Sequence, residues 1–176
     1  MTQFRRRLDR ILSPDYLADL KGVALPDLRT MRAETGEEEA LLSYERRVIH
    51  GRVAIIEAEL DRRSGGATGS LVDRLKDILS DGTVGGTRGG GNLHDPKIVF
   101  DRPNRPTTKV AMDDTLTILD DLSEEQLRER LEAHKDAEKQ VSETRRKVLD
   151  TLDTLNAELG RRYASGEASP DDALKG

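Results

Sequence analysis

Two long stretches of this chain have mostly apolar residues at alternating intervals of three and four positions. We call each such series of positions a seam. The first seam consists of Leu42, Arg46, Ile49, Val53, Ile56 and Leu60. The second consists of Leu131, His134, Glu138, Val141, Arg145, Val148, Leu152, Leu155 and Leu159. This spacing keeps one stripe of a helix turned toward a partner helix and is typical of a coiled coil. The sequence therefore predicts two long helices that pack against each other.

The fold class that follows is all-α, a two-helix coiled-coil hairpin. Both seams lie on one chain, which favours a monomeric hairpin over a homodimer. The connection between the helices has about 60 residues, so the spacing alone leaves parallel and antiparallel packing open. Aromatic residues make up 3% of the chain and charged residues 36%, which suits long solvated helices better than a thick globular core.

The two helical stretches also repeat each other in sequence. Residues 39–63 and 138–162 align without a gap, 99 positions apart, and share nine identical residues in 25. The shared residues include Glu39, Ser43, Arg46, Arg47, Glu59, Leu60, Arg62 and Arg63, which match Glu138, Ser142, Arg145, Arg146, Glu158, Leu159, Arg161 and Arg162. The helical seam is duplicated together with its polar residues.

The polar residues inside the seams have two explanations. Within each copy Glu, Ser and Arg stand at i, i+4 and i+7, so they share one helical face. Charged groups in an apolar seam cost stability unless they are paired or meet a ligand. One explanation is structural, because pairing of Glu39 with Arg145 and of Glu138 with Arg46 would fix the packing of the helices. The other is a polar ligand site with approximate two-fold symmetry.

The ligand that suits such a site contains guanine and phosphate. Guanine presents O6 and N7 to a donor such as arginine, and its N–H groups suit a carboxylate. Serine hydroxyls and further arginines suit phosphate oxygens. Cyclic di-GMP is two-fold symmetric and carries two guanines and two phosphates, so it is the regulatory ligand that we expect.

These residues also resemble a known family. RsiG-type anti-sigma factors of actinobacteria are antiparallel coiled coils with two copies of Glu-x-x-x-Ser-x-x-Arg-x-x-x-Gln-x-x-x-Asp. The chain is similar to them in the duplicated motif, in Pro14 to Leu20 (PDYLADL), in Leu42 to Arg47 (LSYxRR) and in Gly51-Arg52. The resemblance implies antiparallel packing, binding of cyclic di-GMP and sequestration of the sporulation sigma factor WhiG. It covers both long helices and the N-terminal segment.

Carried over by position, the resemblance implies eight ligand-binding residues. They are Glu39, Ser43, Arg46 and His50 in the first copy, and Glu138, Ser142, Arg145 and Asp153 in the second. Three positions depart from the family pattern, because His50 and Leu149 replace Gln and Ala54 replaces Asp. The second hypothesis is therefore a coiled-coil adaptor or anti-sigma protein that no longer needs the nucleotide.

The chain divides into five predicted segments. They are a short helical segment at 1–24, the first long helix at 26–63, a flexible Gly/Pro-rich linker with short helices at 64–122, the second long helix at 123–163, and a disordered tail at 164–176. Gly36 either weakens the first helix or divides it in two. Ser123 and Gln126 predict a capping box. Within the linker we expect a helix at 70–79 and a short strand at 97–100.

The sequence argues against several functional classes. His50, His94 and His134 are scattered without a metal-ligand spacing, there is no cysteine, and Gly85 to Gly91 lacks the Gly-Lys-Ser/Thr of a phosphate loop. We expect neither an enzyme nor a metal. The net charge of −5 argues against direct nucleic-acid binding. Since no apolar run is long enough to span a membrane, a cytoplasmic location is expected.

Overall fold

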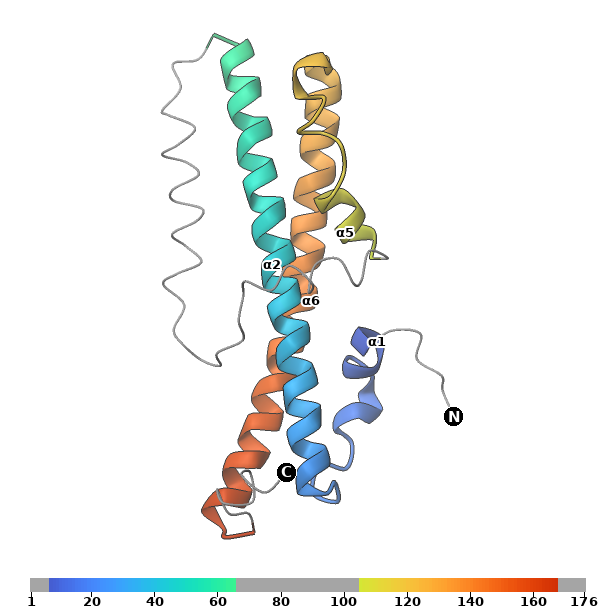
Figure 1. Ribbon diagram of the computed structural model, residues 1–176, viewed down its shortest axis with the longest axis vertical. Helices are drawn as coiled ribbons and strands as arrows, with labels where there is room; N and C mark the ends of the chain where they lie inside the picture. The colour runs from blue at the N-terminus through green and yellow to red at the C-terminus, as the bar shows by residue number, and fades with distance from the viewer. Residues whose placement is uncertain (1–6, 66–104, 168–176) are drawn as a thin grey trace. The chain divides into compact units, whose positions relative to one another are not determined.

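The computed structural model of the protein describes residues 7–65 and 105–167 (Figure 1). Its elements are the α-helices α1 (Arg7–Ile11), α2 (Leu25–Arg63), α5 (Pro106–Ala111) and α6 (Glu124–Ala164), and the 3₁₀ helices η1 (Pro14–Leu17) and η2 (Leu119–Asp121). The predicted helix at 70–79 and the predicted strand at 97–100 lie outside the described residues, as do most of the predicted linker and of the predicted tail.

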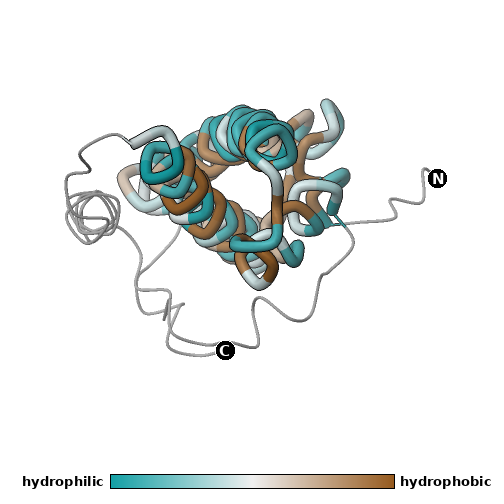
Figure 2. Tube along the Cα trace, turned by 90° about the horizontal axis from the view of Figure 1, so that it is seen from above, coloured by the Kyte–Doolittle hydropathy of each residue, from teal (hydrophilic) through white to brown (hydrophobic). Residues whose placement is uncertain are grey.

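The predicted all-α hairpin of two long helices is confirmed by α2 and α6. Seam residues Ile49 and Ile56 of α2, and Val148 and Leu155 of α6, are fully buried. Hydrophobic and hydrophilic residues alternate along the tubes of the long helices in Figure 2, as the amphipathic spacing requires. Of the two alternatives at Gly36, the structure has one uninterrupted helix.

The second long helix begins with the predicted capping box. The backbone N–H of Gln126 donates to Ser123 Oγ at 3.2 Å, and the Ser123 N–H donates to Gln126 Oε1 at 2.8 Å. Both hydrogen bonds satisfy amide groups that the first helical turn cannot pair.

The chain forms two compact units, each described here by itself. The first unit comprises Met1–Ala40 and Arg145–Gly176, and the second comprises Leu41–Thr144. Each unit therefore contains part of α2 and part of α6.

In the first unit, α2 and α6 run antiparallel. Arg29 Nε lies 3.2 Å from the hydroxyl of Tyr163, and three residues later Arg32 Nε lies 3.0 Å from Oδ1 of Asn156. The core consists of Leu28, Leu155 and Leu159. Residues 14–24, which we call the η1 segment, pack Tyr16, Leu17, Leu20 and Val23 against it. Arg7 of α1 bonds to Glu37 at 2.6 Å and to Glu38 at 3.1 Å, which attaches α1 to α2.

In the second unit, the same two helices also run antiparallel. Arg46 pairs with Glu138, and Glu57 pairs with Lys135 at 3.1 Å. The core consists of Ile56, Leu122, Leu127 and Leu131. α5 is attached to α2 by a hydrogen bond of 3.2 Å from Thr108 Oγ1 to Glu45. Packing in both units confirms the direction that the resemblance implied and the spacing left open.

The two units are built alike beyond the 25-residue repeat. Leu28 and Leu127, 99 positions apart, are both completely buried. Thr35 and His134 stand at the same interval, and both are completely buried too. The duplication therefore extends N-terminal to residues 39 and 138 as a structural repeat.

Candidate functional site

In the second unit, one carboxylate oxygen collects three donors from the predicted site. Glu138 Oε1 lies 3.1 Å from Arg46 Nε, 2.9 Å from His50 Nε2 and 2.7 Å from Ser142 Oγ. Burial by itself would raise the pKa of the Glu138 carboxyl, but hydrogen bonds from Ser142, His50 and Arg46 outweigh it and hold that pKa below its ordinary value. Glu138 is therefore an ionised acceptor at neutral pH.

In the first unit, the corresponding pair joins Arg145 to Glu39. Arg145 Nε lies 2.8 Å from Glu39 Oε1, and the two side chains are 33% and 20% exposed. The position that matches His50 is Leu149, so this pair has no imidazole beside it. Each unit thus contains one Glu–Arg pair between α2 and α6, and both pairs are those that the structural explanation of the seam required.

The remaining predicted residues are less uniform. Ser43 is half-buried on α2 in the second unit, and Asp153 is exposed on α6 in the first. Ala54, which stands where the family has Asp, is buried with 6% exposure. A buried alanine offers a ligand no hydrogen bond, so the first copy lacks the group that Asp153 supplies in the second.

The Glu–Arg pairs combine complementary charge with access to solvent. The Arg46 side chain is 37% exposed and contacts Glu138 through Nε, so the pair is not closed off from solvent. Guanidinium and carboxylate groups are the chemical pair that binds guanine edges and phosphate oxygens. Among the described residues there is no group of three or more His, Cys, Asp or Glu that could hold a metal ion.

A second role of the duplicated pattern had not been predicted. Arg162 donates to the backbone oxygens of Leu20 at 2.6 Å and Val23 at 2.8 Å, and to Glu158 at 2.8 Å. In the other unit, Arg63 donates in the same way to the backbone oxygens of Leu119 and Leu122 and to Glu59. These arginines attach the segment before each long helix to the end of the opposite helix. The sequence held a signal of this role, because Arg63 and Arg162 are identical residues in the two aligned copies.

We expect the two glutamates of this arrangement to make stability depend on pH. Hydrogen bonds from Arg62 and Arg161 are the main causes that lower the pKa of Glu59 and Glu158 from 4.5 to about 2. A lowered pKa in the folded state contributes stability above the ordinary value, and that contribution is lost as the pH falls toward the folded-state pKa. The free energy of unfolding, measured by urea titration, should therefore fall between about pH 4.5 and pH 2.

Other carboxylates titrate in the same range, so a variant serves as the control. Glu59→Gln with Glu158→Gln should be less stable at neutral pH and should lose less stability on acidification. An unchanged dependence on pH in this double variant would contradict the assignment.

Both Glu–Arg pairs lie in parts of the chain that match a known protein family. The family model described as RsiG-like matches residues 14–79 and 113–175, which include η1, both long helices and both Glu–Arg pairs. The chain belongs to the RsiG-like family. Membership indicates an anti-sigma factor role, and the family is not one of enzymes. No curated protein matches the chain. Of the helices in the described ranges, none is long and apolar enough to cross a membrane.

Proposed function

We propose that this RsiG-like chain binds cyclic di-GMP through its duplicated motif and thereby sequesters a WhiG-type sigma factor. Sequestration would keep the sigma factor from RNA polymerase core and repress sporulation or differentiation genes. The observation that carries the proposal is the repeated Glu–Arg pair, with Ser142 bonded to the Glu138 carboxylate in one unit. Serine also recurs at the same place in both copies of the motif, as Ser43 and Ser142, which suits recognition of a ligand with two equivalent halves.

The site residues would act by complementary hydrogen bonding. Arg46 and Arg145 would donate to guanine or phosphate, and Glu39, Glu138 and Asp153 would accept from guanine N–H groups. Ser43, Ser142 and His50 would donate to phosphate or base. To bind the ligand in this way, the glutamate and the arginine of each pair must first separate from each other. Because the paired side chains are partly exposed, breaking each pair costs at most about 1 kcal/mol.

Isothermal titration of cyclic di-GMP into the full chain, alone and mixed with a WhiG-type sigma factor, tests the proposal. We expect saturable binding in at least one of the two mixtures, and the stoichiometry will show whether the copy with Ala54 still functions. Cyclic di-AMP is the control nucleotide, because it keeps the phosphates and replaces both guanines. Equal affinity for the two nucleotides would contradict recognition of guanine.

A second candidate function is an anti-sigma factor that needs no nucleotide. Glu138 is already satisfied by Arg46, His50 and Ser142 within the protein, and position 54 is a buried alanine. This candidate predicts tight binding of the sigma factor in the absence of nucleotide and no heat on titration with cyclic di-GMP. The same titration therefore distinguishes the two functions.

A further inference from the structure

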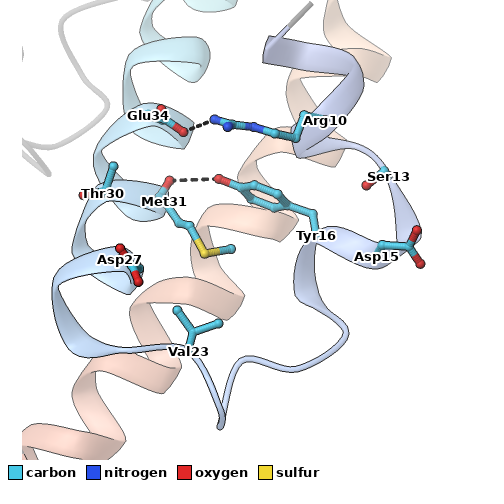
Figure 3. A pocket seen from close by; sticks show the side chains of 9 residues that line it. All are labelled: Arg10, Ser13, Asp15, Tyr16, Val23, Asp27, Thr30, Met31 and Glu34. Carbon is cyan, nitrogen blue, oxygen red and sulfur yellow. Dashed lines mark hydrogen bonds and ion pairs between the residues drawn. The ribbon is translucent and has the colours of Figure 1, made fainter. Parts of the chain in front are cut away.

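A hollow with a volume of about 440 Å³ lies in the first unit between the η1 segment and α2 (Figure 3). Tyr16, Val23 and Met31 supply its apolar lining. In Figure 3, Tyr16 and Met31 approach each other from η1 and α2, and the Tyr16 hydroxyl donates to the Met31 backbone oxygen at 3.3 Å. We call this hollow the η1 groove.

The polar residues of the η1 groove are predominantly acidic. Asp15, Asp27 and Glu34 line it together with a single cation, Arg10. Arg10 pairs with Glu34 and lies 6.0 Å from the centre of the Tyr16 ring. Asp15 and Asp27 are exposed, and no cation within residues 7–65 and 105–167 forms an ion pair with either. The groove thus combines an apolar lining with two exposed carboxylates that form no ion pair within the part of the chain that the structure describes.

The second unit shows how the corresponding position is filled. At the repeat interval of 99, Asp114 corresponds to Asp15 and Arg130 corresponds to Met31. Arg130 Nη1 lies 3.3 Å from Asp114 Oδ1, 3.3 Å from Asp113 Oδ2 and 3.3 Å from Thr115 Oγ1. The second unit therefore supplies a guanidinium from its own helix, whereas the first unit has the uncharged Met31 at that position.

We propose that the η1 groove binds an arginine or lysine side chain of the partner protein. This inference rests on the proposed function, because the partner is the sigma factor. The aliphatic stem of the basic side chain would pack on Tyr16 and Met31, and its charged end would face Asp27. The Asp15 carboxylate, which points away from Met31 in Figure 3, would add negative charge at the rim.

Two variants of the full chain test the inference by their affinity for a WhiG-type sigma factor. Met31→Arg introduces the residue that the second unit has at the corresponding position, Arg130. The new guanidinium should occupy the groove and compete with the basic side chain of the partner. Asp15→Lys with Asp27→Lys reverses the charge at exposed positions. Each variant should weaken sigma binding by at least about tenfold, and the loss for the lysine variant should shrink at high salt. Asp150→Lys, at an exposed position of α6 outside the groove, should bind normally.

The outcomes separate the inference from the proposed function. Wild-type affinity in both groove variants would overturn the inference and leave the proposed function intact. Failure of the wild-type chain to bind the sigma factor, with or without cyclic di-GMP, would overturn both. Sedimentation of the chain alone is the remaining test. If the wild type dimerises and Met31→Arg abolishes the dimer, the groove binds a second copy and the inference is wrong. Should Met31→Arg fail to fold, the lysine variant decides.

Discussion

Replacement of Arg145 by alanine is expected to weaken the binding of cyclic di-GMP by about 10- to 100-fold, because one arginine that pairs with guanine contributes about 1–3 kcal/mol. Arg145 matches the family motif, and its partner Glu39 lies 2.8 Å away on α2. In the variant the nucleotide loses the hydrogen bonds that Arg145 would donate, and Glu39 loses its ion pair with Arg145. Isothermal titration with the nucleotide measures the loss directly.

The neighbouring arginine is a matched control for that experiment. Arg146 is exposed on the same helix and carries the same charge, so Arg146→Ala changes the general attraction for phosphate without touching the Glu–Arg pair. It should leave the affinity nearly unchanged. Folding should change by less than about 1 kcal/mol in Arg145→Ala, since the lost pair is partly exposed. Equal losses in the two variants would show that the nucleotide responds only to net charge.

The largest expected effect on stability is that of Arg162→Ala, a loss of about 2–4 kcal/mol in the free energy of unfolding. Arg162 is 7% exposed. Its removal leaves the backbone oxygens of Leu20 and Val23 without their donor, and it takes one of two arginines from Glu158. Unfolding in urea, with the slope compared between variants, measures the change.

The control is again the adjacent residue. Arg161 also bonds to Glu158, but its side chain is 44% exposed, and among the described residues it bonds to no backbone oxygen. Arg161→Ala should therefore cost no more than about 1 kcal/mol. A loss as large as that of Arg162→Ala would mean that the ion pair with Glu158, rather than the bonds to the backbone oxygens, provides the stabilisation.

The candidate site was predictable in part. Because polar residues recur within an otherwise apolar seam, the sequence left a structural and a ligand-binding explanation open. The structure shows the pairing of Glu39 with Arg145 and of Glu138 with Arg46 that the structural explanation required. The addition of His50 and Ser142 to the Glu138 oxygen was not predicted. It depends on side-chain rotamers across a helix interface, and these follow from three-dimensional packing rather than from residue spacing.

The sequence by itself determined the local features of this protein. Periodicity of the seam placed the two long helices, since a helix forms its own backbone hydrogen bonds within a few residues. The Ser123 and Gln126 box marked the start of α6 for the same reason. Tertiary structure alone decided the partners of Arg162, which lie 139 and 142 residues away in the chain, and the groove at Tyr16. Such contacts depend on the direction and register of the packed helices, and residue spacing leaves both unspecified.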